Sequence, residues 1–298
     1  MKVMTAGALI ALALPLLQQA TDRPKVLGIA HVAFYVSDLA KTRAFYKEFL
    51  GFDEEPFTLK KPDGSERIAF IKINDQQYIE LFAEAPKTDG RLNHVSIYTD
   101  NADRMRDYLA GRGVKVPEKV GKGQTGNKNF TVRDPDDHGV EIVEYQPDSW
   151  TTRESGKHMP DTHVSAHIVH AGFAVADPRK AMAFYNGILG FTEQWRGSSS
   201  PTDAALTWVD VRVPDGSDYF ELILDPSPAT ADDRASKSHV SLIVDDAQKT
   251  ADQLKKRAAN GVYAKPIAIE VGANHRRQIT VFDPDGTRIE LIEAQAAS

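Results

Sequence analysis

The sequence of 298 residues contains no cysteine. This absence excludes a disulfide framework, a thiolate nucleophile and a lipid-anchored cysteine. Basic residues are not in excess either, because the formal net charge is −6 and Lys and Arg are scattered among acids. Such a chain has no field that attracts a nucleic-acid backbone, so we expect its partner to be a small molecule.

The start of the chain, MKVMTAGALIALALPLLQQA, holds an apolar stretch from Val3 to Leu17 that is too short to span a bilayer. Lys2 precedes it and a polar segment follows, which predicts a secretory leader over residues 1–22 that is removed on export to the periplasm or medium. Gln18 departs from the small residue expected before the cut. The alternative is an apolar helix packed on the fold of a cytoplasmic protein.

An internal repeat divides the rest of the chain. The segment IAHVAFYVSDLAKTRAFYKEFLGF, from Ile29, resembles IVHAGFAVADPRKAMAFYNGILGF, from Ile168. Each half divides again, because NHVSIYTDNADRMRDYLAGRG, from Asn93, and SHVSLIVDDAQKTADQLKKRAANG, from Ser238, repeat the order of His-headed strand, acidic cap and helix. We therefore expect four modules in two domains, 23–147 (modules 23–90 and 91–147) and 164–298 (modules 164–235 and 236–298), joined by a linker at 148–163.

Each module is predicted to have the order β-α-β-β-β. An apolar strand leads into an acidic cap and a helix: Ser37 or Asp38 caps the helix of the first module, and Asp177 caps that of the third, with Pro178 at the first helical position. Short alternating strands such as RIAFIKI and QYIELF follow each helix. The predicted class is α+β, with helices outside the sheets.

Alternation along these strands places one His and one Glu of each module on its open face. In HVAFYV, the bulky Val32 and Phe34 must cover the helix, so His31 projects to the other side beside small Ala33. The last strands follow the same rule, since Glu290 alternates with Ile289 and Leu291. The full set is His31, Glu80, His94, Glu141, His170, Glu221, His239 and Glu290.

Two curved modules would bring two imidazoles and two carboxylates together. That donor set suits Zn²⁺, Ni²⁺, Mn²⁺ or Fe²⁺ with positions left for a substrate. The alternative is that interior His–Glu pairs only maintain the fold. Buried acids without a cation are costly to keep charged, which favours a divalent metal ion as cofactor.

These motifs resemble the vicinal oxygen chelate superfamily, which includes glyoxalase I, extradiol dioxygenases and bleomycin resistance proteins. The HV strand heads, the AFY…LGF helices and the DPDx turns before E-I or E-L carry the resemblance over residues 29–293. It implies paired βαβββ modules forming two cupped, incompletely closed β-barrels with metal inside. For a glyoxalase-like lyase or isomerase, all eight residues match the ligand positions, and Glu141 or Glu290 would move the proton of an enediolate-type intermediate.

An extradiol dioxygenase is the main alternative, and there the resemblance selects His170, His239 and Glu290 as an Fe²⁺ triad. The dioxygenase signature has a tyrosine three residues before the DPDG turn, but Thr280 stands there, and Thr131 stands at the same place in the first half. His275 is a nearby candidate acid/base residue or a solvated loop residue. A third possibility is a non-catalytic module that binds a small molecule.

Several questions stay open at the level of sequence. Modules could pair first with second and third with fourth, or first with fourth and second with third. The chain could be a monomer or a homodimer, and one or both halves could bind metal. The DPDx turns at Asp134 and Asp283 resemble calcium loops in acidity, but Pro at the second position predicts tight turns.

Overall fold

The computed structural model describes residues 22–55, 57, 59–85, 90–198, 208–224 and 237–294. Residues 1–21, which hold nearly all of the expected leader, lie outside the described part. Among the described residues, no helix is both long enough and apolar enough to cross a membrane.

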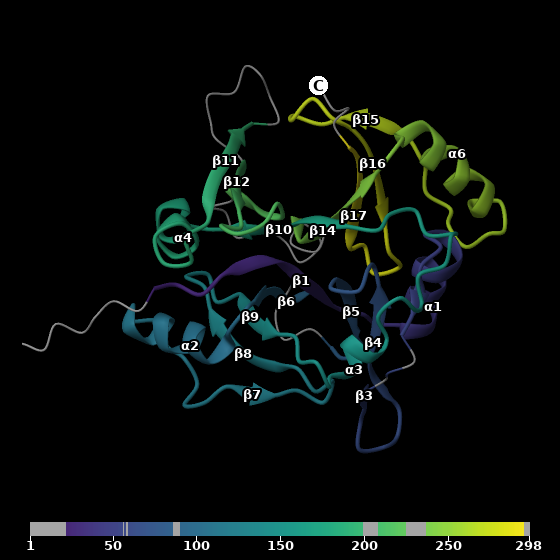
Figure 1. The fold of residues 1–298 in the computed structure, drawn as a ribbon. Coiled ribbons are helices and arrows are strands. Elements are labelled where there is room, and N and C mark those ends of the chain that lie inside the picture. Colours follow the sequence, from purple (N-terminus) through teal and green to yellow (C-terminus); the bar gives the residue numbers. More distant parts are fainter. Residues whose placement is uncertain are drawn as a thin grey trace, which may run out of the picture.

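The described strands form two sheets, one from each half of the chain (Figure 1). The strands of the first sheet are β1 (Val26–Tyr35), β2 (Asp53–Glu54), β3 (Leu59–Lys60), β4 (Glu66–Lys72), β5 (Tyr78–Phe82), β6 (Leu92–Thr99), β7 (Gly121–Lys122), β8 (Lys128–Arg133) and β9 (Gly139–Glu144). Their order is β2-β4-β5-β1-β6-β9-β8-β7, with β3 beside β4.

The second sheet repeats this plan. Its strands are β10 (Ile168–Val175), β11 (Thr192–Gly197), β12 (Trp208–Arg212), β13 (Tyr219–Leu224), β14 (His239–Val244), β15 (Ile269–Val271), β16 (Arg277–Phe282) and β17 (Arg288–Glu293). Their order is β11-β12-β13-β10-β14-β17-β16-β15.

Each sheet consists of two adjacent modules joined along their first strands. β1 pairs antiparallel with β6, and β10 pairs antiparallel with β14. Modules therefore pair first with second and third with fourth, which answers the question that the sequence left open. The sheets are strongly curved and not closed, so the predicted α+β fold of four βαβββ modules in two cupped, incompletely closed barrels is confirmed (Figure 1).

The first helix of each module begins where an acidic or amide side chain caps it. Asp38, Asn101, Asp177 and Asp246 each accept hydrogen bonds from backbone N–H groups of the first turn. The described helices are α1 (Leu39–Ala44), which continues as the π-helical segment η1 (Phe45–Phe49), α2 (Ala102–Gly111), α3 (Trp150–Arg153), α4 (Pro178–Tyr185) and α6 (Ala247–Ala258). The cap expected at Ser37 or Asp38 is Asp38, and Gly51, with φ of 79°, ends the η1 segment.

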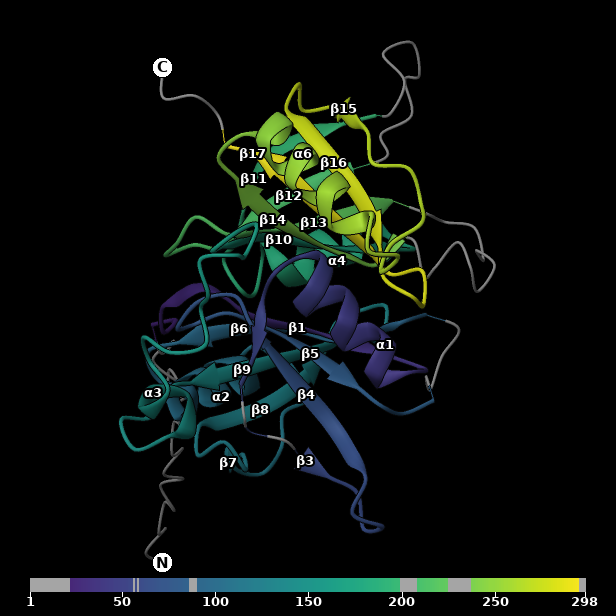
Figure 2. The ribbon, with the colours of Figure 1, turned by 90° about the vertical axis from the view of Figure 1, so that its right-hand side faces the viewer.

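The two sheets lie back to back, with their concave faces directed away from each other (Figures 1 and 2). A single core fills the space between them and the helices, and it contains the predicted helix-facing residues Val32, Phe34, Ile289 and Leu291. The helices flank this interface, and the Tyr108 hydroxyl of α2 donates to the Ile188 carbonyl of the other half. The packing leaves both concave faces directed outward.

The repeated DPDx turns also connect the halves. Within each turn, the first aspartate accepts backbone hydrogen bonds, as Asp283 does from the N–H groups of Asp285 and Thr287, so these segments are tight turns. The third residue reaches the other half: Asp285 accepts from the backbone N and hydroxyl of Ser37, and Asp136 accepts from the backbone N of Ala176.

Candidate metal centre and its counterpart

Four central strands position the sequence-predicted residues of the first half. His31 lies in the middle of β1, Glu80 on β5, His94 on β6 and Glu141 on β9. Their strands are neighbours in the order β5-β1-β6-β9, and all four side chains project from the concave face, which we call the first cup. The alternation that put them opposite the core is confirmed by the burial of Val95, Val140 and Ile142 in that core.

The four side chains converge to a small volume. His31 Nε2 lies 2.8 Å from His94 Nε2 and 3.2 Å from Glu141 Oε2, which is 2.9 Å from His94 Nε2. Glu80 lies slightly further away, with its carboxylate oxygens 3.6 Å from His31 Nε2 and 4.0 Å from His94 Nε2. Two imidazoles and two carboxylates thus direct donor atoms at one point, which is a donor set that fits a divalent transition-metal ion.

The charges in the first cup depend on each other. Burial lowers the pKa of the His31 imidazole, but the negative charges of Glu80 and Glu141 outweigh that effect and raise it overall. Burial raises the pKa of Glu80. Burial would do the same to Glu141, yet hydrogen bonds from His31 and His94 hold the pKa of Glu141 well below its usual range. Glu141 is therefore a carboxylate in the folded protein.

A cavity of about 500 Å³ opens above these four residues. Part of its wall is apolar, from Ile68, Phe70, Phe82 and Trp150, and part is polar, from a set of amides and hydroxyls: Gln124, Thr125, Asn127, Asn129, Thr131, Tyr145 and Thr151. The segment GKGQTGN, residues 121–127, contributes to this wall through the turn after β7. The volume is sufficient for a small organic molecule.

Two cavity residues were not predicted from the sequence. Asn129 Nδ2 donates to Glu141 Oε1 at 2.6 Å; since Asn129 shares the alternating face of Thr131 on β8, the strand period could have found it. Trp150 comes from α3, in the segment expected to be a linker, and its ring lies 4.6 Å from that of Phe57. No local pattern places a linker residue against Phe57, which lies more than ninety residues earlier in the first module.

The second cup, the concave face of the second sheet, brings together the other four predicted residues. His170 on β10 and His239 on β14 lie with their Nε2 atoms 3.0 Å apart, and Glu290 Oε2 on β17 is 3.4 Å from His170 Nε2. Glu221 Oε1 on β13 is 3.4 Å from His239 Nε2. The geometry of the predicted donors is thus similar in both cups.

Two further charged residues lie in the second cup, and neither belongs to the set predicted from the sequence. Arg288, on β17, has Nη2 2.7 Å from His239 Nδ1 and Nη1 3.3 Å from Glu290 Oε1. Asp210, on β12, is paired in register with Glu221 and is 6% exposed. Arg288 is two residues before Glu290 on the same strand, so the two side chains project from the same face. Asp210 is the register partner of Glu221 on the neighbouring strand, so these two side chains also share a face.

These residues change the electrostatics of the second cup. Burial and the Arg288 guanidinium lower the pKa of His239 to about 3. Burial, together with the charge of Glu290, raises the pKa of Asp210 to about 7, and burial raises that of Glu221 to about 7 as well. Glu290 keeps a depressed pKa, because nearby His239 and Arg288 outweigh the effect of its burial.

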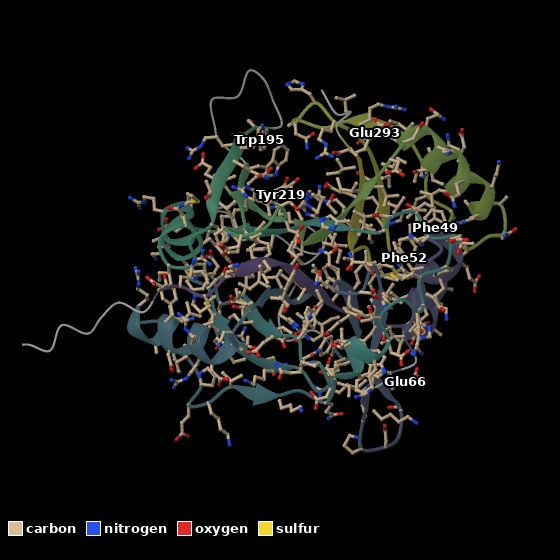
Figure 3. All side chains as sticks on the ribbon, viewed as in Figure 1. Phe49, Phe52, Glu66, Trp195, Tyr219 and Glu293 are labelled. Atoms are coloured by element: carbon tan, nitrogen blue, oxygen red, sulfur yellow. The ribbon has the colours of Figure 1, made fainter. Side chains whose placement is uncertain are left out.

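The space in the second cup is divided differently from that in the first. The cavity beside its donor residues measures about 80 Å³, and Trp195, Trp208 and Arg288 form part of its lining. A further cavity of about 590 Å³ is lined by Trp208, Thr280 and Arg288, but by none of the four donor residues. Trp195 lies on the wall strand β11, whereas Tyr219 lies nearer the cup floor, where its hydroxyl is 2.8 Å from His170 Nδ1 (Figure 3). The small neighbour Gly172 leaves no free space, since a Cβ there would lie 1.9 Å from His239 Cε1.

The fold and the paired cups define a known class of protein. The sequence model of the Glyoxalase/Bleomycin resistance protein/Dioxygenase superfamily matches residues 28–142 and 167–291. The chain belongs to this superfamily, as the resemblance predicted.

The similar proteins and solved structures include both glyoxalases and dioxygenases. Glyoxalase I of Saccharomyces cerevisiae is 20% identical, over 93% of this chain and 95% of the yeast protein. A lactoylglutathione lyase of Salmonella typhimurium is 28% identical, over 44% of this chain and 94% of the relative.

Two crystal structures share the fold. The 2,3-dioxygenase LapB from Pseudomonas sp. KL28 has a TM-score of 0.66 at 14% identity, covering 91% of this chain and 93% of that one. The Mn(II)-bound glyoxalase from Novosphingobium aromaticivorans has a TM-score of 0.65 at 17% identity, covering 91% and 83%. Relatives of both kinds are enzymes that act on small molecules, which supports an enzyme of this superfamily without choosing its reaction.

Proposed function

We propose that this chain is a divalent-metal-dependent lyase or isomerase of the glyoxalase type, and that it acts in the first cup. The observation that carries the proposal is the convergence of His31, Glu80, His94 and Glu141 at the floor of a cavity of about 500 Å³. The substrate would be a small molecule with two neighbouring oxygens.

The four residues of the first cup would hold the metal. When bound there, a divalent ion supplies Lewis acidity that stabilises negative charge on neighbouring substrate oxygens. Zn²⁺, Ni²⁺, Mn²⁺ and Fe²⁺ all accept this mixture of nitrogen and oxygen donors. A solved structure with the same fold supports this assignment, because it is a glyoxalase bound to Mn(II).

Glu141 is the residue proposed to move the proton. Its carboxylate is ionised, and the Asn129 amide, which donates to Oε1, fixes its orientation toward the cavity. A carboxylate held in this way can take a proton from one substrate carbon and return it to the neighbouring carbon. The apolar wall formed by Phe70, Phe82 and Trp150 limits the access of water to the reacting carbons.

The charges of the lining favour a compact substrate. Among the described lining residues of the first cavity, Arg67 is the only Lys or Arg, and its guanidinium is paired with Glu84. A glutathione adduct carries two carboxylates that need cationic partners. An uncharged hemithioacetal or hydroxyketone therefore matches this wall better.

Extradiol dioxygenase chemistry in the second cup is the second candidate. The donor atoms of His170, His239 and Glu290 lie within 4.8 Å of one another, and LapB shares the fold. Two features count against it: Thr280, which pairs with Glu290 across β16 and β17, stands in place of the signature tyrosine, and Arg288 contacts the triad.

Metal analysis and two assays test these candidates. The purified mature chain is analysed for bound metal and then assayed with methylglyoxal hemithioacetals, of glutathione and of 2-mercaptoethanol, and with a catechol under air. We expect isomerisation of a hemithioacetal, faster with the uncharged thiol, lost in Glu141→Gln and retained in Glu290→Gln. Oxygen uptake with catechol that is lost in His239→Ala would instead support the dioxygenase. Absence of bound metal would contradict both enzymes and leave a binding module.

A further inference from the structure

The Arg288 side chain lies beside the second donor set. Its Nη2 is 2.7 Å from His239 Nδ1 and 3.3 Å from His239 Nε2. The same guanidinium is 3.3 Å from Glu290 Oε1 and 4.0 Å from Glu221 Oε1. It therefore contacts three of the four residues that correspond to the metal ligands predicted in the first cup.

The first cup has a glycine at the corresponding position. In register, Arg288 lies opposite His239 on the parallel pair β14 and β17, just as Gly139 lies opposite His94 on β6 and β9. The two residues also occupy the same place in the repeat, two residues before Glu290 and Glu141. The cups thus share histidines and glutamates but differ in whether the chain itself supplies a cation.

A guanidinium provides what these carboxylates require. It stays protonated throughout the pH range of a folded protein and presents several donors in a planar fork. Because a positive charge stabilises a buried acid as an anion, Arg288 stabilises Glu290 without a metal. A divalent ion in the same place would have to displace this cation or tolerate its repulsion.

We propose that Arg288 is the permanent cation of the second cup, so that the chain binds catalytic metal in the first cup alone. The inference concerns the cup that the proposed reaction does not use, and it stands independently of which reaction the first cup performs. It also gives the second cup a structural role, as a fixed internal ion cluster on the sheet that backs the active half. Of the two cavities that Arg288 lines, the one that reaches His170, Glu221 and Glu290 measures only about 80 Å³, which agrees with that role.

Metal stoichiometry tests the proposal. The purified protein is stripped of metal with a chelator, loaded with Mn²⁺ and dialysed, and the bound metal is counted per chain. We expect about one Mn²⁺ in the wild type, lost in His94→Ala and retained in His170→Ala. Removing the cation in Arg288→Gly, which copies the first cup, should raise the count to about two. The second cation-free variant Arg288→Ala should do the same, whereas Arg277→Ala, which removes a charge from the neighbouring strand, should stay at one.

Several outcomes would overturn the proposal. These are two Mn²⁺ in the wild type, loss of the single Mn²⁺ in His170→Ala, or a count of one in folded Arg288→Gly and Arg288→Ala, with folding checked by circular dichroism. If neither Arg288 variant folds, the two histidine variants decide. One Mn²⁺ without turnover would contradict the proposed function alone, whereas two Mn²⁺ with turnover would contradict this inference alone.

Discussion

The two cups come from one repeated sequence, but they differ in the residue that faces their two glutamates. The second cup has the guanidinium of Arg288 beside them, and the first has a glycine at that place. Both place two histidines and two glutamates on four central strands, at similar separations. The first cup has Gly139 and Phe70 where the second has Arg288 and Asp210. These two differences in register accompany a cavity of about 500 Å³ over the first donor set and one of about 80 Å³ beside the second, and we propose that they decide which cup binds metal.

The largest expected effect concerns the equivalent glutamates. Glu141→Gln should reduce kcat/KM with the best hemithioacetal by about 10²–10⁴-fold, because it removes the proposed base. Glu290→Gln should change kcat/KM by less than about threefold, since in the proposed function the second cup takes no part in the reaction. Steady-state kinetics of both variants check this, and similar losses in the two would contradict the asymmetry.

The next test introduces an arginine into the first cup at the position that corresponds to Arg288. In Gly139→Arg the new guanidinium would lie beside His94 and Glu141, where repulsion of a divalent ion should weaken metal binding at least about a hundredfold. Titration of the apo protein with Mn²⁺ measures the affinity. Gly139→Leu controls for bulk: an equal loss in that variant would show that size, and not charge, is responsible.

We expect Asp210 to make the stability of the protein depend on pH. Phe70, which stands at the same place in the first cup, has no ionisable group and cannot have this effect. Burial raises its pKa to about 7, above that of an unfolded aspartate, so its ionised form is disfavoured in the folded state. The resulting destabilisation is absent below about pH 4, grows as the pH rises and is complete above about pH 7.

Removing this acid should therefore stabilise the protein most at high pH. Asp210→Asn should raise the free energy of unfolding by about 1–3 kcal/mol more at pH 8 than at pH 5. Urea denaturation with chelator present measures the difference. The exposed Asp252→Asn on α6 serves as a control, and equal gains at the two pH values would contradict the prediction.

The smallest effect concerns the tryptophans beside each cup. Trp150 lies on the wall of the first cavity against Phe57, so Trp150→Ala should raise KM about three- to tenfold with little change in kcat. Trp208→Ala in the second cup should leave both constants unchanged. A kcat loss in Trp150→Ala would mean that the ring positions the reacting atoms.

Much of the fold follows from local sequence patterns. The repeats predicted four modules, and strand alternation placed His31, Glu80 and Ala33 opposite the core residues Val32 and Phe34, as the structure confirms. Arg288 and Asp210 obey the same alternation. They were not predicted because histidine and glutamate recur in every module, whereas these two residues have no counterpart of like charge in the first half.

The sequence by itself determined the module order, the helix caps and the face of each strand, because these depend on backbone periods within about ten residues. Only the tertiary structure decided which modules pair, that the guanidinium of Arg288 reaches His239, and that Trp150 covers a cavity in the first cup. These features depend on sheet curvature and on side-chain reach between strands far apart in the chain. Metal binding by the eight predicted residues stays a prediction, and the first cup is the place to measure it.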